Sequence, residues 1–403
     1  MQNLTEKWAP VLNHEDAPKI TDSYRSAITA QLLENTQTAL REQSIVEATG
    51  NSISSNFGGL GTVNSQFDPV LISLVRRSMP NLIAYDIAGV QAMKAPTGLI
   101  FALQPKYSPG TSSESDAFVS GVEGRNVINT AFSGTGSPSA GTPMPTSTGE
   151  GDISKEMGFD IVRTSVTVGT RQLKSGYTLE LAQDLKAVHG LDAETELANI
   201  LTTEILAEIN REVVNKVNTS AQTASNFDLV TNADGRWAGE KFKSLAFKIE
   251  LEANTIAKRT RRGKGNFIIC SSNVASALAA SGQLDYSPAL SSKLNVDDTG
   301  NTFAGVLNGR IKVYIDPYAP ATDYITVGFR GTNQYDAGLF YCPYVPLQMV
   351  RAVDPANFQP VIAFKTRYGM VANPFVPNGL SANTNPYYRK FDVTNINVGE
   401  QYT

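Results

Sequence analysis

The sequence predicts a protein of mixed α and β structure, an α+β fold, built around one long helix. Three observations lead to this prediction: a helical pattern from Tyr177 to Val217, alternating helix and strand patterns from about 219 to 340, and two strand patterns that enclose a long polar stretch. A chain of 403 residues can bury a large core and suggests two or more domains. We expect the long helix to be the element against which the other parts pack.

The long helix is predicted in two segments. Thr178 is a natural N-cap residue, and Glu180 in the first turn suits the positive end of the helix dipole. His189-Gly190 interrupts the pattern, and Asp192 opens the second segment. In that segment apolar residues recur at every fourth position: Leu197, Leu201, Ile205, Ile209 and Val213. Because such a ladder drifts by about 40° per step around a helix, we expect these core residues to contact different neighbours along its length.

The first 47 residues are predicted to form a distinct leader. After a loose start that contains Pro10 and Pro18, Asp22 can cap a helix. The apolar residues of this helix are Ala27, Ile28, Leu32, Leu33 and Leu40. The leader has four Lys and Arg residues against seven Asp and Glu residues, so its net charge is −3 and the rest of the chain is almost neutral. A turn-rich joint follows from Ala48 to Gly61, and we expect the leader to have no compact core of its own.

Between the leader and the long helix the sequence predicts an extended arm. A short helical pattern from Phe67 to Met79 is followed by a strand from Thr97 to Leu103. The next stretch, 108–151, is rich in Gly, Ser, Thr and Pro and has too few large apolar residues to fold compactly alone. A second strand from Phe159 to Val168 leads into the long helix. Because so long a loop is improbable inside a compact domain, we expect paired strands that carry the polar stretch onto a neighbouring molecule.

The chain after the long helix predicts an α/β domain and then a strand-rich end. A linker is expected from Ala221 to Gly235. Helices and strands then alternate, with helices at Glu240–Arg259 and Val274–Ala280 and strands at Asn266–Cys270, Gly309–Ile315 and Tyr324–Phe329. Two more strands are expected at Leu339–Pro346 and Phe358–Val371, and the polar tail after Pro374 is expected to be irregular.

The composition excludes several classes of protein. Hydrophobic residues are 41% and charged residues 18% of the chain, and the formal net charge of −4 gives no electrostatic case for nucleic-acid binding over the whole surface. Cys270 and Cys342 are far apart and lack a metal-ligand spacing, so we expect neither a disulfide nor a metal site. No apolar run approaches a membrane span and the N-terminus has no signal-peptide pattern, so we expect no membrane association and synthesis in the cytoplasm.

A search for catalytic motifs finds none, so we expect no enzyme activity and no cofactor. Only His14 and His189 could serve as imidazole bases, and the position of His189 beside the helix break favours a structural role. The single basic cluster consists of Lys258, Arg259, Arg261, Arg262 and Lys264. One interpretation is that these positive charges interact favourably with the negative end of the helix dipole and continue into a solvated loop. The other is an inter-subunit contact with acidic neighbours, or a contact with DNA.

Five blocks of the sequence carry a resemblance to a known family. They are Pro80–Ile87, Gln183–Asp192, Gly235–Lys243, Phe340–Tyr344 and Asp354–Gly369. In this order they resemble the major capsid protein of T4-like tailed bacteriophages, which are myoviruses. The resemblance implies the HK97 capsid fold, which has an N-terminal arm (N-arm), an extended loop (E-loop), a peripheral domain containing a long spine helix, and an axial α/β domain.

The resemblance also implies how these parts divide the chain. The expected parts are a helical propeptide at 1–47, the N-arm at 48–93, the E-loop at 94–170 with a flexible excursion at 108–151, the peripheral domain at 171–218 and 340–403, and the axial domain at 219–339. Members of the T4 type carry an insertion domain near the E-loop, and in this chain the 108–151 stretch stands in that region. The long helix would then be the spine helix of the peripheral domain.

The family further implies that a phage prohead protease removes the leader. The protease cuts after Glu in a Leu/Ile-x-Glu context that precedes a small residue. Ile45-Val46-Glu47-Ala48 fits this pattern at the predicted end of the leader. Ile45 and Val46 would be the recognition residues, and the maturation cleavage would fall between Glu47 and Ala48.

The function implied by the resemblance is that of a major capsid protein. It would assemble into hexamers, build the icosahedral head of a tailed phage, and mature by removal of the leader. Its partners would be further copies of itself, a vertex capsid protein, the portal, the scaffold core, the prohead protease and decoration proteins. It would enclose double-stranded DNA without specific binding, and it would be assembled in the bacterial cytoplasm and end in the virion. The alternative is an encapsulin-like nanocompartment shell of the same fold, which has no cleaved leader.

Overall fold

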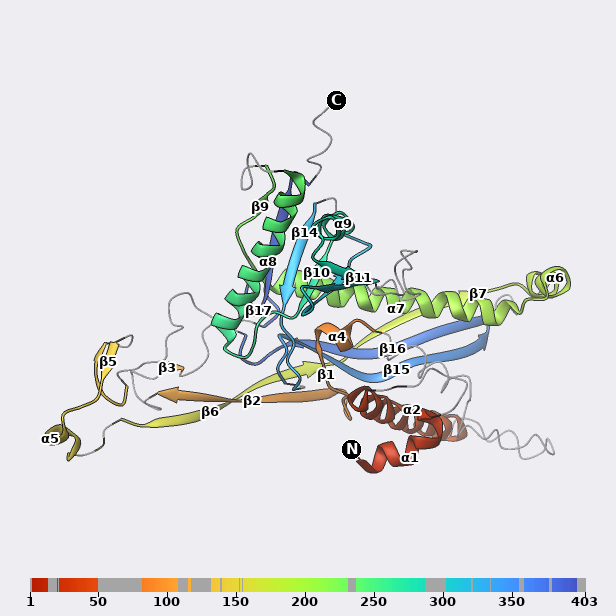
Figure 1. Ribbon diagram of the computed structural model, residues 1–403. Helices are drawn as coiled ribbons and strands as arrows, with labels where there is room; N and C mark the ends of the chain where they lie inside the picture. Colours follow the sequence, from red (N-terminus) through yellow and green to blue (C-terminus); the bar gives the residue numbers. More distant parts are fainter. Residues whose placement is uncertain are drawn as a thin grey trace.

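The computed structural model describes residues 2–13, 20, 22–49, 82–107, 115–116, 132–137, 140–151, 153, 155–230, 237–286, 302–319, 322–333, 335–354, 359–376 and 379–396. Two β-sheets with helices packed on them form the body, and a long two-stranded arm projects from one side (Figure 1). The structure is therefore of mixed α and β type, as predicted. The helix predicted at 67–79 lies outside the described residues, as does most of the joint predicted at 48–61.

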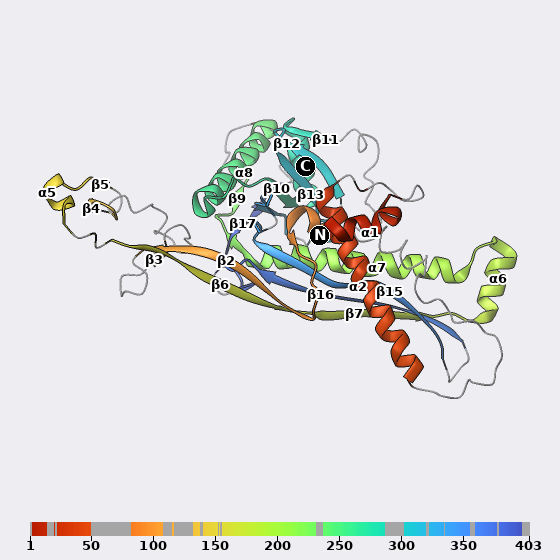
Figure 2. The ribbon, with the colours of Figure 1, turned by 90° about the horizontal axis from the view of Figure 1, so that it is seen from below.

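The long helix is present and is divided where the sequence predicts. α6 (Leu179–His189) begins after Thr178, whose hydroxyl accepts a hydrogen bond from the backbone N–H of Leu181 at 3.2 Å. It ends at Gly190, whose φ of 66° lies in the left-handed region that glycine adopts most readily. α7 (Ala193–Ser220) follows with 28 residues and crosses the body of the molecule (Figures 1 and 2).

The first sheet has four strands in the order β1-β15-β16-β7. They are β1 (Gly89–Val90), β15 (Leu339–Val353), β16 (Pro360–Ala372) and β7 (Gly169–Gly176). α7 packs on β7 and β16 from one side, and α2 (Ser23–Thr49) packs on β15 from the other (Figures 1 and 2). β15 begins with five consecutive buried residues, Leu339 to Pro343, because its two faces at this end lie in two different apolar clusters.

A network of charged and polar side chains attaches α7 to this sheet. Arg171 of β7 forms ion pairs with Glu208 at 2.8 Å and with Glu212 at 2.5 Å, both on α7. The Tyr368 hydroxyl of β16 donates a hydrogen bond to the Glu212 carboxylate at 2.6 Å. Burial acts to raise the pKa of Glu212, but the hydrogen bonds from Tyr368 and Arg171 outweigh it and hold the pKa below its ordinary value. Glu212 therefore links the helix to two neighbouring strands as a carboxylate.

The second sheet has eight strands, seven of them in the order β11-β12-β13-β10-β14-β17-β8, with β9 paired to β17. They are β8 (Ala221–Thr223), β9 (Phe227–Asp228), β10 (Phe267–Cys270), β11 (Leu284–Tyr286), β12 (Thr302–Leu307), β13 (Ile311–Ile315), β14 (Tyr324–Gly328) and β17 (Asn385–Thr394). α8 (Ala238–Thr260) packs on β14 and β17, and α9 (Ser272–Ala280) packs on α8, β11 and β13. The alternation of helix and strand expected here is thus present.

Two expectations about this region are wrong. The tail after Pro374 is not irregular, because β17 lies inside the second sheet between β14 and β8, with Tyr388 and Phe391 buried. The linker expected at 221–235 contains β8 and β9, which both pair with β17. The segment 340–403 is consequently split, since β15 and β16 belong to the first sheet and β17 to the second. These pairings join residues far apart in the sequence, so no local pattern reveals them.

A buried ion pair fixes α8 to the second sheet. Glu252 of α8 accepts a hydrogen bond from Arg389 of β17 at 3.0 Å and pairs with Lys248 at 2.9 Å. Burial acts to raise the pKa of Glu252, but Lys248 and Arg389 outweigh this effect and hold the pKa below the ordinary value of 4.5. A carboxyl whose pKa is lower in the folded than in the unfolded chain contributes stability above its unfolded pKa. That contribution is lost as the pH falls through the folded pKa.

Glu252→Gln is therefore expected to destabilise the subunit at pH 7 by about 1–3 kcal/mol, because the amide keeps an acceptor but removes the charge that faces Arg389. The difference from the unmodified chain should shrink as the pH falls below 4.5. Urea unfolding midpoints between pH 7 and pH 3 measure it. Glu240→Gln, at an exposed position in the first turn of the same helix, is the control and should change little. A difference that stays constant over this pH range would contradict the role given to the Glu252 charge.

The leader packs on the body, and its start is helical. α1 (Gln2–Leu12) replaces the loose start expected around Pro10, because tertiary contacts stabilise it: Trp8 and Leu12 are buried, and Lys7 forms an ion pair with Glu34 of α2 at 2.6 Å. Asp22 caps α2 as predicted, by accepting a hydrogen bond from the backbone N–H of Tyr24 at 3.0 Å. α2 continues to Thr49, so the backbone is helical through the predicted cleavage site.

The described residues offer no centre for metal or thiol chemistry. Within them, His, Cys, Asp and Glu side chains form no group of three or more that could hold a metal ion. Cys270 and Cys342 are buried free thiols, and burial raises the pKa of each to about 12, so neither is an activated thiolate. No helix in the described part of the chain is long and apolar enough to cross a membrane.

Candidate assembly surface

The arm is a ladder of two long antiparallel strands. β2 (Thr97–Tyr107) pairs with β6 (Met157–Thr167) over all 11 residues of each strand. Both strands extend further outward than the sequence predicts, and β3 (Ser115–Asp116) adds a short third strand to β2. The segment 97–167 is called the β-arm below. Its outer part includes β4 (Thr135–Ser137), β5 (Ala140–Thr142) and the short helix α5 (Thr146–Gly149).

One face of the β-arm is apolar and exposed. Residues directly opposite each other in an antiparallel pair share a face, and the register places Leu103 opposite Ile161 and Pro105 opposite Phe159. The large apolar side chains on this face are Leu99, Phe101, Leu103, Met157, Phe159 and Ile161, and each is between 53% and 72% exposed. Large exposed apolar patches on soluble proteins mark interaction sites. We call this set of six residues the arm face.

The opposite face of the β-arm is used inside the subunit. Near the body, Ile100 and Val166 are buried in a cluster with Met93 and with Phe340 and Cys342 of β15. Further out, Lys106 and Asp160 form an ion pair at 3.1 Å, and the hydrogen bond from Lys106 lowers the pKa of the Asp160 carboxyl. The two faces therefore differ: one attaches the β-arm to its own subunit, and the other leaves six large apolar side chains more than half exposed.

The sequence contains a signal for the arm face that the alternation alone did not reveal. Along residues 157–168 the large apolar residues occupy odd positions from Met157 to Ile161 and even positions from Val162 through Val166 to Val168. Successive residues of a strand point to opposite faces, so this change of parity moves the apolar side chains from one face to the other. It marks the point where the strand leaves the contact with its own body.

A second group of exposed apolar side chains lies toward the far end of the molecule. α6 has no buried residue, and the large apolar side chains exposed on it and beside it are Leu179, Leu181, Val188, Leu191 and Ile200. We call these five residues the distal face. α6 lies at one end of the molecule and the β-arm projects from the other (Figures 1 and 2). Two different exposed apolar surfaces at opposite ends are compatible with a head-to-tail contact between identical subunits. Such contacts close into a ring if the rotation between neighbouring subunits brings the last subunit back to the first.

The core positions predicted on the long helix lie where α7 meets the rest of the subunit. Leu201, Ile205, Ile209 and Val213 are buried, and Leu197 is half-buried at the edge of the same core. Ile200, one position before Leu201, is exposed and belongs to the distal face. The ladder therefore drifts out of the core toward the start of α7. For the predicted cleavage site, Ile45 to Ala48, only the helical backbone of α2 is described.

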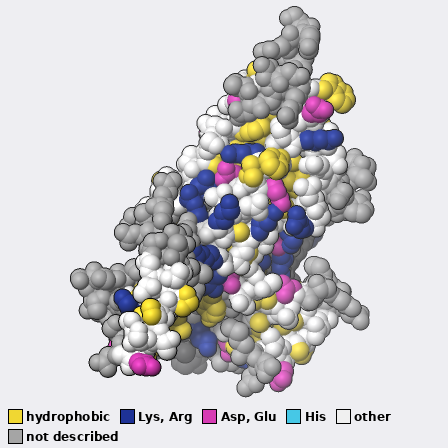
Figure 3. Space-filling model, turned by 60° about the vertical axis from the view of Figure 1, so that its left-hand side comes forward, with side chains coloured by type: hydrophobic (Ala, Val, Ile, Leu, Met, Phe, Trp, Pro, Cys, Tyr) yellow, Lys and Arg dark blue, Asp and Glu magenta, His cyan; other side chains and the backbone are white. Residues whose placement is uncertain are grey.

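The predicted basic cluster is divided by the structure. Lys258 and Arg259 lie in the last turn of α8, and Arg261 follows in the left-handed conformation with a φ of 52°. Arg262 pairs with Asp336 at 2.8 Å, Lys264 pairs with Glu250, and Arg259 donates to the side chain of Gln222. On the side from which the β-arm projects, lysine and arginine side chains gather beside hydrophobic ones (Figure 3). Three members of the cluster thus contact groups of their own subunit.

The chain matches known capsid proteins along most of its length. The family described as "Major capsid protein Gp23" matches residues 64–393. The major capsid protein of Salmonella phage ViI is 38% identical over 441 aligned positions, covering 96% of this chain and 97% of that protein. The major capsid protein of Enterobacteria phage T4 is 36% identical over 485 positions, covering 94% and 93%.

Two further similarities are weaker. The capsid vertex protein of Enterobacteria phage T4 is 31% identical over 237 aligned positions, covering 54% of this chain and 53% of that protein. The solved capsid of Myoviridae phage XM1 is 10% identical, with a TM-score of 0.45, and the superposition covers 78% of this chain and 92% of that one.

Proposed function

The chain belongs to the Gp23 major capsid protein family of T4-like phages and is a structural component of the tailed-phage head, not an enzyme. We propose that it builds the shell by head-to-tail contacts between the arm face and the distal face. The observation that carries the proposal is the presence of two exposed apolar surfaces at opposite ends of one subunit. In a closed ring every arm face and every distal face would be covered, and neither surface would remain free to drive open-ended growth. A hexamer is the ring expected for the family.

The parts of the subunit correspond to those of the HK97 capsid fold in this proposal. The β-arm is the E-loop, α7 with the first sheet is the peripheral domain, and the second sheet with α8 and α9 is the axial domain. In this proposal residues 385–394 belong to the axial domain and not to the peripheral domain, because β17 pairs within the second sheet. Support comes from the α7 network, which makes the helix and the first sheet one unit.

The same proposal implies the partners of the protein. The similarity to the T4 major capsid protein covers 94% of the chain, whereas that to the T4 capsid vertex protein covers 54% of it. This difference favours the hexamer positions over the vertices. A separate vertex protein, the portal, the scaffold core, a prohead protease and decoration proteins would complete the head. Arg259, Arg262 and Lys264 contact groups of their own subunit. The proposed contact with an acidic neighbour would therefore use Lys258 and Arg261, the other two members of the basic cluster.

Assembly of the expressed protein tests the proposal. With the phage prohead protease present, electron microscopy should show closed icosahedral shells whose subunits lack the leader. An encapsulin-like shell, the alternative, would close without protease and keep residues 1–47. A protein that stays monomeric at high concentration, with or without protease, would refute both.

Glu47→Ala is expected to keep the leader attached, because the protease pattern of the family requires Glu before the cut. Shells should then stop at an immature stage. The intact mass of the subunit in purified particles measures this directly. Glu42→Ala, five residues earlier in the leader, removes the same charge outside the Ile45-Val46-Glu47 pattern and should be processed normally. Mature unmodified particles whose subunit mass includes residues 1–47 would refute the cleavage at this site.

A further inference from the structure

The leader helix reaches the free edge of the first sheet. Among the described strands β1 bonds only to β15, through pairs such as the N–H of Gln91 donating to the carbonyl of Tyr341 at 3.0 Å. Because alternate residues of a strand direct their backbone groups to opposite sides, the N–H and carbonyl of Val90 face away from β15. The Tyr24 hydroxyl accepts from the Val90 N–H at 3.1 Å and donates to the Val90 carbonyl. It satisfies both backbone groups at that point of the edge.

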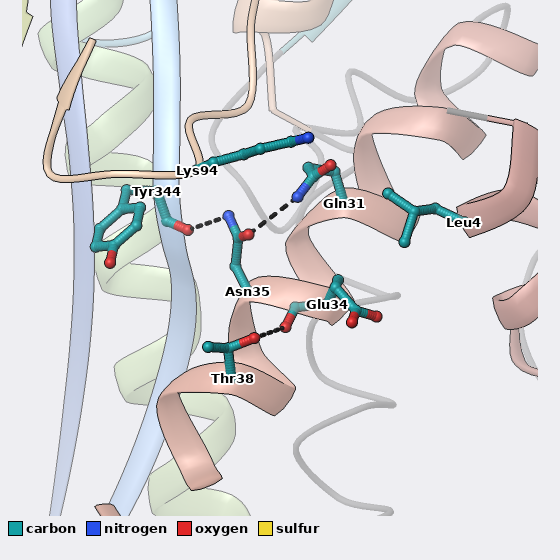
Figure 4. Close-up of a pocket in the computed structure, with 7 residues that line it drawn as sticks. All are labelled: Leu4, Gln31, Glu34, Asn35, Thr38, Lys94 and Tyr344. Carbon is teal, nitrogen blue, oxygen red and sulfur yellow. Dashed lines mark hydrogen bonds between the residues drawn. The ribbon is translucent and has the colours of Figure 1, made fainter. Parts of the chain in front are cut away.

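A second contact lies three residues further along the chain. The side-chain amide of Asn35 donates to the carbonyl of Met93 at 2.7 Å and to the carbonyl of Tyr344 in β15 at 2.8 Å. Gln31, one turn earlier, donates to the Asn35 side-chain oxygen at 3.1 Å and holds the amide in this orientation. Figure 4 shows Asn35 directed from α2 toward Tyr344, with Lys94 above it. The amide therefore bridges the end of the β1 segment and the adjacent strand.

Met93 connects this contact to the β-arm. Its backbone N–H donates to the Pro343 carbonyl of β15 at 2.9 Å, while its carbonyl is held by Asn35. Its side chain is buried in the cluster with Ile100 and Val166, which form the base of the β-arm. A Cβ on Gly98 would lie 3.1 Å from Cε of Met93, so the contact with β2 is close. One residue thus touches the leader with its backbone and the β-arm with its side chain.

The leader is firmly seated at this place. Arg25 pairs with Asp86 at 2.8 Å and lies over the Tyr85 ring at 5.5 Å. Ile28, Leu32 and Leu33 of α2 are buried in the main core. The polar contacts of Tyr24 and Asn35 therefore rest on an apolar interface and are not isolated surface hydrogen bonds.

We infer that the leader is a clamp on the base of the β-arm: while attached, it fixes residues 90–93 through Tyr24 and Asn35, and its release lets the β-arm change direction against the body. The inference rests on the proposed removal of the leader and adds what that removal does to the subunit. The hydrogen bonds that release would remove, to the Val90 backbone and to the Met93 carbonyl, lie shortly before β2. A change of direction there moves the whole arm face, because β2 and β6 are paired along their full length.

Hydrogen–deuterium exchange of the full-length, uncleaved subunit tests the clamp. Tyr24→Phe combined with Asn35→Ala removes both polar contacts and keeps the Tyr24 ring. Exchange in the peptides that cover residues 89–104 and 157–168 should become at least tenfold faster, whereas exchange in α7 and in the second sheet should not change. Protein from which the protease has removed the leader should show the same local increase.

Thr38→Ala is the matched control. Thr38 lies near Asn35 on α2, and within the described part of the chain its hydroxyl bonds only to the Glu34 carbonyl of its own helix (Figure 4). It should leave exchange at the arm base unchanged. Unaltered exchange in the double variant would overturn the clamp. An increase spread evenly over the chain would also overturn it, because a clamp acts locally. Tyr24→Phe alone repeats the test with the smaller change. Since these measurements need no cleavage, a failure of the clamp is distinct from a failure of leader removal, which intact mass reports.

Discussion

Shells are expected to be absent when Phe101→Asp is combined with Phe159→Asp, although the free subunit stays folded. Both side chains lie on the arm face and are more than half exposed, so in the free subunit each new carboxylate would remain in water. In the proposed contact each would be buried against a neighbouring subunit without a partner, at a cost on the order of several kcal/mol per charge. Size-exclusion chromatography and electron microscopy measure assembly, and circular dichroism checks the fold of the subunit.

Asp160→Ala is the control for these substitutions. It is adjacent to Phe159 on the same strand but lies on the opposite face, and it should assemble normally. Val188→Asp on the distal face should block assembly in the same way. A mixture of the arm variant and the Val188→Asp variant should stop at dimers, since each pair retains one intact contact. Normal shells from the arm variant, or normal shells from the mixture, would contradict the head-to-tail contact.

Ile205→Ala should be among the most destabilising single substitutions in the chain. Ile205 lies in the middle of α7 with 1% of its surface exposed, and its removal would leave a cavity between the helix and the rest of the core. Truncation of a buried Ile to Ala costs about 2–5 kcal/mol. The urea unfolding midpoint of the free subunit should fall accordingly, and the yield of soluble subunit should fall with it.

Glu204→Ala provides the comparison one residue away. Glu204 is exposed on α7, and surface substitutions of this kind change stability by about 0.5 kcal/mol or less. If the two variants unfolded at the same urea concentration, α7 would not be oriented as described. Leu197→Ala should lie between them, because Leu197 is only half-buried where the ladder leaves the core.

Some features could be predicted from the sequence because local interactions create them. Thr178, Gly190 and Asp22 mark helix boundaries through contacts within a few residues, and each acts in the structure at the end where it was expected. The two strands of the β-arm and the long polar stretch between them follow from alternation and composition. The family follows from five blocks spread from residue 80 to residue 369, which no single element supplies.

Other features could not be predicted because they depend on residues distant in the chain. β17 has polar and aromatic residues in no clear alternation, and it is a strand because β14 and β8 offer it backbone partners on both sides. The helix α1 contains Pro10 and is stabilised by Trp8 and Lys7 against α2. Ile200 and Leu201 are equally apolar neighbours, yet only the packing of α7 decides that one is exposed and the other buried.

The sequence by itself determined the kind of protein: a long capped helix, a two-stranded arm, no catalytic constellation, and the blocks of the capsid family. Only the tertiary structure decided how these parts act on one another. It buried one face of the β-arm against its own body and left the other exposed, and it placed the leader against Val90 and Met93. The physical reason is the range of the interactions. Caps and alternation act within a few residues, whereas the face of a strand and the seat of a helix are set by hydrogen bonds and buried contacts between segments far apart in the chain.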